Sequence, residues 1–242
     1  MHDMFGLVHL IALGVSFAII VLAILFVDRI SFDKLLKILL YGGIISETIK
    51  VFVYIIINTD NYGGMGYLPK TDLPFHLCSI QIIFIFILNF SKNENLKRKL
   101  LAFMLPSCLI GGFMALLIAT SSSRSIPWIT VQYFGYHTMI TCFSIYLIKT
   151  KEIKFNIKDY FDALKLLALF CFIAIYLNSW INDGSNKINF MYVVAPPQDG
   201  LPFLNMNQGW FVYFIRYALV ALVSVSLVYI GPIIRALKKE NK

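Results

Sequence analysis

Cys78 is placed where a thiol is well suited to covalent chemistry. It ends the run Leu73-Pro74-Phe75-His76-Leu77-Cys78, in which a polar loop becomes an apolar stretch. A cysteine attacks as its thiolate, which a neighbouring imidazole or a helix N-terminus favours. All four histidines, including His2 at the terminus, fall in the same half of the predicted membrane protein as this cysteine. A thiol near imidazoles at a lipid–water boundary suggests acyl transfer through a thioester.

Two histidines compete as the base for that thiol. His76 precedes Cys78 by two residues, a spacing that puts the two side chains on nearly opposite sides of a regular helix. His137 lies ten residues after Pro127, a favourable first helical residue, and is the better base if its helix neighbours that of Cys78. Counting the rise places Cys78 about 6 Å and His137 about 15 Å below their helix starts, so contact requires tilt or unequal starting levels.

Further polar residues are candidates for binding the substrate. Gln81 follows Cys78 by three residues, shares its helix face and is a possible donor to an oxyanion. Asn189 and Tyr192, in the long link 182–208, are alternative donors. His9 lies one turn into the first apolar stretch, and we include it in the predicted site.

Three charged residues fall inside apolar stretches. Glu47 and Lys50 are spaced i, i+3 and are able to pair, and Arg216 lies about two turns into the last stretch. A charge at such depth costs at least about 2.5 kcal/mol, so it normally faces a wet cavity or another charge. Two interpretations remain open: a buried Glu47–Lys50–Arg216 network that fixes helix packing, or a polar pocket open to the outside.

The composition excludes a soluble globule, because the chain is 59% hydrophobic and 14% charged, with a mean hydropathy of +0.75. A helix needs about 20 apolar residues to cross the hydrocarbon core. We therefore predict one all-α domain over residues 1–242. Its seven expected transmembrane helices are 4–27, 38–57, 73–90, 100–119, 126–148, 163–181 and 210–234.

Basic residues predict the orientation of this bundle. Sixteen Lys and Arg residues flank alternate ends of the expected spans, against three in the other loops. This bias places the N-terminus outside and the C-terminus in the cytoplasm, in the cell membrane and most simply a bacterial plasma membrane. The net charge of +8 then matches anionic inner-leaflet lipid. Nucleic acid is not an expected partner, because no basic stripe outside the membrane carries interleaved aromatic residues.

Three short elements resemble a known family. Leu73 to Cys78 is similar to the LPxHLC element of the YwaF-like bacterial integral membrane proteins, which are related to the animal transmembrane protein 164 acyltransferases. Tyr133-Phe134-Gly135-Tyr136-His137 and Asn189-Phe190-Met191-Tyr192 resemble two further elements of that family, in the same order. The resemblance implies a multi-pass fold and, for the animal relatives, transfer of acyl chains between phospholipids through a cysteine thioester.

Carried over by position, the resemblance makes Cys78 the nucleophile and His137 the base. The chain departs from the family pattern at Phe190, where Tyr is usual, and at Ser79, where an acidic residue is common. A missing carboxylate at position 79 removes one possible partner that would orient a histidine.

Three functions are compatible with these residues. The first is an acyltransferase without a cofactor, whose partners are the acyl chains of membrane phospholipids or lipoproteins. The second is a zinc-dependent lipid hydrolase, with His76, Cys78, His137 and possibly His9 as ligands, although no carboxylate stands at ligand spacing. The third is a carrier or receptor whose path is lined by Glu47, Lys50 and Arg216.

Overall fold

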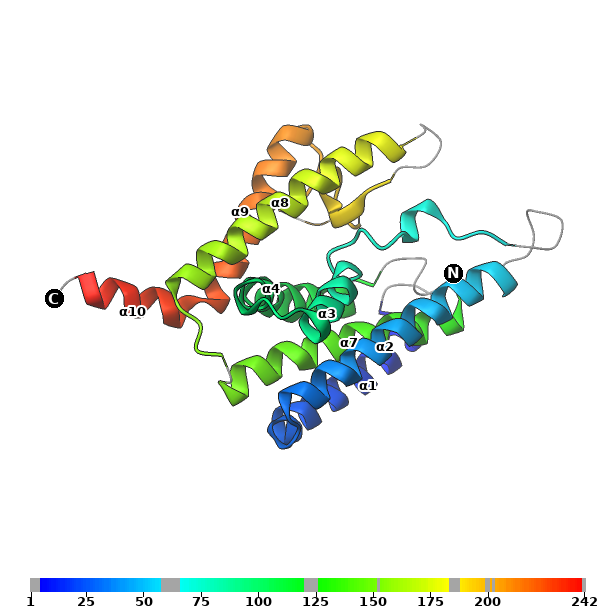
Figure 1. Ribbon diagram of the computed structural model, residues 1–242. Helices are drawn as coiled ribbons and strands as arrows, with labels where there is room; N and C mark the ends of the chain where they lie inside the picture. The colour runs from blue at the N-terminus through cyan, green and yellow to red at the C-terminus, as the bar shows by residue number, and fades with distance from the viewer. Residues whose placement is uncertain are drawn as a thin grey trace.

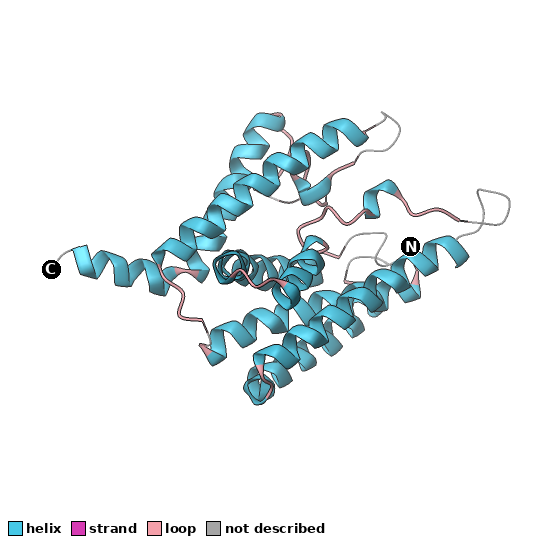
Figure 2. Ribbon diagram, in the orientation of Figure 1, coloured by secondary structure: helices cyan, strands magenta, loops and turns pink. Residues whose placement is uncertain are grey.

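The protein is an assembly of helices. The computed structural model describes residues 5–57, 66–119, 126–151, 153–182, 188–198, 201 and 203–240, so His2 lies outside the described residues. Within these ranges every regular element is a helix and no strand occurs (Figure 2). The predicted all-α class is confirmed for this part of the chain.

Five helical segments are long and apolar enough to cross a membrane. They contain α1 (Leu7–Phe26), α2 (Phe32–Phe52), α4 (Glu94–Pro106) continuing into α5 (Gly112–Leu117), α8 (Ile157–Ile181) and α9 (Trp210–Val228). The chain is therefore a multi-pass membrane protein. The predicted number of seven spans depends on two further helices, α3 and α7.

Helix α7 (Pro127–Thr150) has 24 residues, enough to cross, but its apolar character is diluted by polar side chains. These side chains, among them Thr130, His137, Thr141 and Ser144, are buried inside the protein. The helix packs against α1, α2, α4 and α5, and Figure 1 shows it among them. Its polar residues face other helices, which explains its low hydropathy.

Helix α3 (Ile80–Phe90) has only 11 residues, so the predicted span 73–90 is helical over little more than half its length. Residues 74–79 form turns instead. Irregular backbone at membrane depth is tolerated where it is buried in protein or lines a cavity. This turn segment carries Cys78.

The predicted span 210–234 is also interrupted, because α9 ends at Val228 and α10 (Ile230–Glu240) begins after Tyr229. The Tyr229 hydroxyl donates a hydrogen bond to the Ala102 carbonyl at 2.8 Å, which holds this junction against α4. We call the end of the bundle where α9 ends and α4 and α8 begin the basic end.

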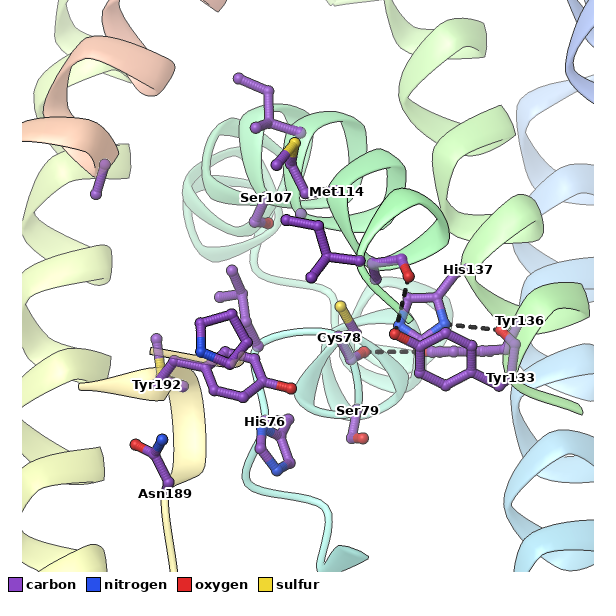
Figure 3. Close-up of a pocket in the computed structure, with 18 of the residues that line it drawn as sticks. His76, Cys78, Ser79, Ser107, Met114, Tyr133, Tyr136, His137, Asn189 and Tyr192 are labelled. Atoms are coloured by element: carbon purple, nitrogen blue, oxygen red, sulfur yellow. Dashed lines mark hydrogen bonds between the residues drawn. The ribbon is translucent and has the colours of Figure 1, made fainter. Parts of the chain in front are cut away.

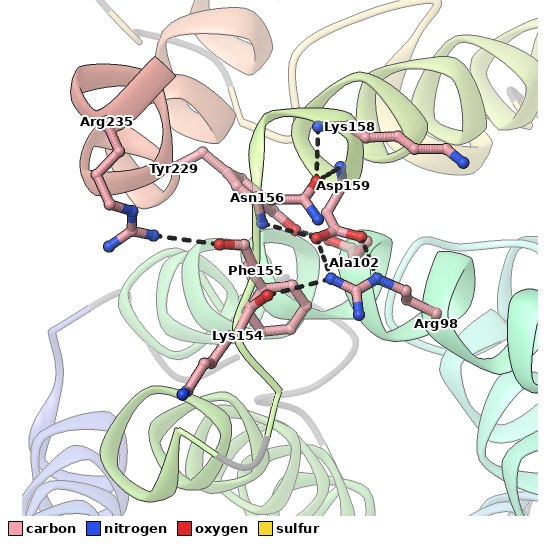
Figure 4. A network of polar contacts seen from close by, with 9 residues as sticks. All are labelled: Arg98, Ala102, Lys154, Phe155, Asn156, Lys158, Asp159, Tyr229 and Arg235. Atoms are coloured by element: carbon pink, nitrogen blue, oxygen red, sulfur yellow. Dashed lines mark hydrogen bonds and ion pairs between the residues drawn. The ribbon is translucent and has the colours of Figure 1, made fainter. Parts of the chain in front are cut away.

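A clamp joins α4 to α8 at the basic end (Figure 4). Arg98 donates through Nε and Nη2 to the two carboxylate oxygens of Asp159, both at 2.8 Å. Asp159 also accepts a hydrogen bond from the Asn156 backbone N–H at 2.7 Å and completes the capping box of α8. One carboxylate therefore starts α8 and fixes it to α4.

Two π-helical turns interrupt the long helices, Val53–Ile57 after α2 and Ser107–Gly111 between α4 and α5. The second directly follows Pro106, which lacks the N–H that a regular helix needs. Such π-helical turns are frequent at functional sites. Both contribute residues to the cavity described next.

Candidate functional site

A cavity of about 500 Å³ lies between the helices and receives side chains from α2, α4, α5, α7, α8 and α9. This volume is typical of a site for a small molecule or lipid chain. The structure brings seven of the ten predicted site residues to its wall: Cys78, His137, His76, Glu47, Lys50, Asn189 and Tyr192. Gln81, Arg216 and His9 are not part of the lining.

Cys78 lies immediately before α3, because Ser79 is the N-cap of that helix. The helix begins later than Pro74 suggests, so the thiol is near the positive end of the helix dipole. The Tyr136 hydroxyl donates to the Cys78 carbonyl at 2.9 Å and holds α7 against this turn. The expected difference in depth between Cys78 and His137 assumed a helix from residue 74; the turn brings both residues to one cavity.

His137 has the hydrogen bonding of a general base. Its Nδ1 lies 2.7 Å from the Tyr133 carbonyl oxygen. Because a carbonyl only accepts, Nδ1 must carry the proton, which leaves the lone pair of a neutral ring on Nε2. Figure 3 draws the His137 ring and the Cys78 side chain among the residues that line one cavity. A backbone carbonyl of its own helix thus fixes the orientation of the His137 ring.

His76 is directed elsewhere. Its Nε2 lies 3.1 Å from the Thr71 carbonyl, and its ring packs edge-on against Phe190 and obliquely against Tyr192, with centroids 5.4 and 5.5 Å apart. In Figure 3 the ring extends away from the Cys78 sulfur. His137 is therefore the better placed of the two candidate bases.

Tyr192 reaches the cavity from a strained loop. Met191 and Tyr192 have φ angles of +57° and +56°, a left-handed conformation that bulky residues rarely adopt. Such strain costs about 1–3 kcal/mol per residue and persists where surrounding contacts enforce it. In Figure 3 the Tyr192 ring lies between His76 and Cys78, with its hydroxyl toward the cysteine segment. Burial raises the pKa of Tyr192 to about 12, so the hydroxyl stays protonated as a donor.

Side chains on neighbouring helices hold this loop in place. Tyr217 donates to the Met191 carbonyl at 2.8 Å, and Tyr213 donates to the Tyr192 carbonyl. The Asn178 amide bonds to both the N–H and the carbonyl of Phe190, at 2.7 and 3.1 Å.

Asn189 serves the same loop rather than a ligand. Its side-chain amide donates to the Ala195 carbonyl at 2.8 Å, and its oxygen accepts from the Val194 N–H at 3.1 Å. These bonds close the segment that carries Tyr192. Asn189 borders the cavity, but we assign it to the support of the loop.

The charged residues divide into two groups. Lys50 forms an ion pair with Glu47 at 2.7 Å and donates to the Asp72 carbonyl at 3.0 Å, and both charged side chains border the cavity. Arg216 instead bonds to Gln208 and Asn205. Of the three-residue network, which was one of the two interpretations, only the Glu47–Lys50 pair is present.

The side chains of Gln81 and His9 form hydrogen bonds to other parts of the protein and support its structure. Gln81 is fully buried, and its amide donates to the Leu77 carbonyl at 2.9 Å and to the Ser107 hydroxyl at 3.0 Å, which braces the Cys78 turn. His9 has both ring nitrogens engaged, Nε2 with the Leu116 carbonyl and Nδ1 with the Phe5 N–H, each at 3.0 Å.

The suggested zinc ligands do not assemble. Over the described ranges, no group of three or more His, Cys, Asp or Glu residues is placed to hold a metal ion. His9, one of the four suggested ligands, has no nitrogen left for a metal and lies outside the cavity lining.

Several residues that shape the site were not among the predicted site residues. The Tyr136 hydroxyl donates a hydrogen bond to the Cys78 carbonyl, and the Tyr217 hydroxyl donates one to the Met191 carbonyl. The Ser107 hydroxyl accepts one from the Gln81 side-chain amide. Tyr136 stands next to His137 in a quoted element, so its position was available as a signal. Tyr217 and Ser107 have no comparable local signal, because their roles depend on contacts between distant segments.

The helices and the cavity that Cys78 and His137 border define a multi-pass membrane protein with a partly buried candidate nucleophile. A family model described as the TMEM164 family matches residues 4–229, which is nearly the whole chain. The chain therefore belongs to the TMEM164 family. Searches of curated proteins and of solved structures found no significant match.

Proposed function

We propose that the protein is a membrane acyltransferase that moves a fatty acyl chain from a lipid donor to a lipid acceptor through a Cys78 thioester. The observation that carries the proposal is that Cys78 and His137 border one cavity, with the His137 tautomer set by the Tyr133 carbonyl. A nucleophile beside an oriented base is the recurring arrangement of covalent acyl transfer.

The first half-reaction forms the thioester. His137 Nε2 takes the proton of the Cys78 thiol while the sulfur attacks the ester carbonyl of the donor lipid. The Tyr192 hydroxyl donates a hydrogen bond to the resulting oxyanion. The tetrahedral intermediate collapses, the ester C–O bond breaks, and the protonated imidazole gives its proton to the departing lysolipid oxygen.

The second half-reaction reverses the roles. His137 removes the proton of an acceptor hydroxyl or amine, which attacks the thioester carbonyl. The carbon–sulfur bond breaks, and the imidazolium returns its proton to the Cys78 sulfur. The product ester or amide leaves with the acyl chain, and the free thiol and neutral imidazole are restored.

We further propose that the cavity opens toward the outer leaflet of a bacterial plasma membrane, with α3 and α7 completing seven passes. The support is the distribution of charge: sixteen Lys and Arg residues flank the expected cytoplasmic ends of the spans, whereas the segments 66–79 and 188–198 contain only Lys70. Donor and acceptor are then membrane phospholipids, or lipoproteins as acyl acceptors.

The test is a trapped acyl-enzyme. Purified protein in vesicles is incubated with phospholipid carrying a labelled acyl chain, and label on Cys78 is measured by mass spectrometry with and without hydroxylamine, which cleaves thioesters. Wild-type protein should carry hydroxylamine-sensitive label. His137→Asn should slow labelling about a hundred- to ten-thousandfold, as expected for loss of a general base. Normal transfer by a folded Cys78→Ala variant would disprove the proposal.

A further inference from the structure

The cavity extends well beyond the thiol. On α9 its lining continues from Tyr217 to Val225, eight residues or about 12 Å along the helix axis toward the basic end. The lining facing this stretch includes Leu167 of α8 and Phe103 of α4. We call this part of the cavity, between α4, α8 and α9 and from Tyr217 to Val225, the branch. Apart from Ser224, its side chains are hydrocarbon or aromatic, so the branch suits an extended acyl chain.

The inner end of the branch, which we call its floor, is closed by tightly packed side chains. It is lined by Phe103, Ala163 and Val225, which are at most 6% exposed and belong to the largest cluster of buried residues described. Beneath them Tyr229 is tied to Ala102, and the Arg98–Asp159 clamp joins α4 to α8 (Figure 4). Closely packed interiors resist the insertion of extra methylene groups. The branch therefore ends at a fixed depth.

The end of the branch opposite its floor lies at Tyr217, on the side of the cavity that carries Tyr192. Tyr217, where the branch starts on α9, donates to the carbonyl of Met191, the residue before Tyr192. An acyl group on the Cys78 sulfur has its carbonyl at this level and its chain free to enter the branch. The distance from this level to the floor is fixed by helix geometry.

From these contacts we infer that the α4–α8–α9 branch is an acyl-chain subsite that selects chains by length. The inference rests on the proposed acyl transfer through Cys78. Two small residues set the available length, Ala221 at about 6 Å and Ser224 at about 10 Å below Tyr217. A larger side chain at the first should exclude more of the chain than one at the second.

Two leucine substitutions test this order. Vesicles contain equal amounts of hexanoyl, decanoyl and palmitoyl phosphatidylethanolamine and phosphatidylglycerol, and the chains bound to Cys78 are identified by mass spectrometry. Wild-type protein should discriminate against palmitoyl, because an extended palmitoyl chain is longer than the branch. Ala221→Leu should lower the decanoyl-to-hexanoyl ratio about tenfold or more, since single methylene groups change discrimination by that order. Ser224→Leu should give a smaller shift. Ala218→Leu is the matched control, because Ala218 is exposed and outside the cavity lining.

A second measurement is independent of catalysis. Cys78→Ala protein is irradiated with a decanoic acid that carries a diazirine near its methyl end, and the labelled peptides are identified. Labelling should fall on the α4, α8 and α9 segments around Phe103, Ala163 and Val225 and should be lost in Ala221→Leu. An unchanged chain profile in Ala221→Leu, or no labelling of these segments, overturns the inference. Absence of any thioester in wild-type protein overturns only the proposed function, because the photolabelling result still decides whether the branch binds a chain.

Discussion

Replacing Tyr192 with Phe removes one hydroxyl and leaves the framework that holds it. The ring contact with His76 and the hydrogen bond from Tyr213 to the residue's carbonyl are both retained. We therefore expect the free energy of unfolding to change by less than about 1 kcal/mol. The rate of thioester formation should fall about a hundred- to a thousandfold, which is the usual effect of removing one oxyanion donor.

The dependence of this effect on pH follows from the burial of the hydroxyl. The pKa of Tyr192 is raised to about 12, compared with an ordinary value of about 10. The donor therefore remains protonated throughout a neutral to mildly alkaline assay, and only stronger alkali would remove its proton. The ratio of wild-type to Tyr192→Phe rates should stay constant between about pH 6 and about pH 9.

The assay measures single-turnover acylation of Cys78 at several pH values, together with thermal unfolding in the same detergent. Tyr217→Phe is the informative comparison, because it removes the donor to the Met191 carbonyl and loosens the strained loop. That variant should lose both rate and stability, whereas Tyr192→Phe should lose rate alone. A wild-type rate in Tyr192→Phe, or a loss explained wholly by unfolding, would refute the role given to this hydroxyl.

Two predictions concern stability. Asp159→Asn should lower the free energy of unfolding by about 2–3 kcal/mol. This is less than the usual 3–5 kcal/mol for a broken buried pair, because the Arg98 partner is 42% exposed. Glu94→Gln is the control: it breaks an ion pair whose carboxylate is 79% exposed and should lower the free energy of unfolding by less than about 0.5 kcal/mol. If Asp159→Asn and Glu94→Gln lowered the free energy of unfolding equally, the stabilising role of the Arg98–Asp159 clamp would be contradicted. Gly112→Ala should destabilise the contact of α5 with α7 by about 1–3 kcal/mol, because its Cβ would lie 2.5 Å from a threonine oxygen, whereas Gly111→Ala has ordinary contacts and should be close to neutral in thermal unfolding.

The sequence was sufficient for the features that depend on composition and short motifs. Long apolar stretches predict most of the crossing helices, and the elements around Cys78 and His137 predict two residues that share a cavity. The start of α3 was not predictable, because Pro74 is an acceptable first helical residue. The turn that follows depends on distant partners, namely the Tyr136 hydroxyl and the Gln81–Ser107 hydrogen bond.

His9 and His137 show the same limit. Each lies in an apolar helix and has the same intrinsic chemistry. His9 meets a carbonyl on one side and an N–H on the other, so both nitrogens are occupied. His137 meets the carbonyl of its own helix through Nδ1, which leaves the lone pair of the other nitrogen available. Which histidine keeps a nitrogen available for the proposed role of base is thus decided by neighbours that no local pattern encodes.

Four departures from regular helix border the same cavity: the turn 74–79, the π-helical turns Val53–Ile57 and Ser107–Gly111, and the left-handed pair Met191–Tyr192. In lipid, backbone groups that leave a helix need partners inside the protein. Here tyrosine hydroxyls supply them, from Tyr136 in the turn and from Tyr213 and Tyr217 in the loop. Strained and irregular backbone around the cavity lowers the stability of the fold and does not improve its packing. Such concentration is expected where geometry serves binding or chemistry, and it favours a functional cavity over a passive gap between helices.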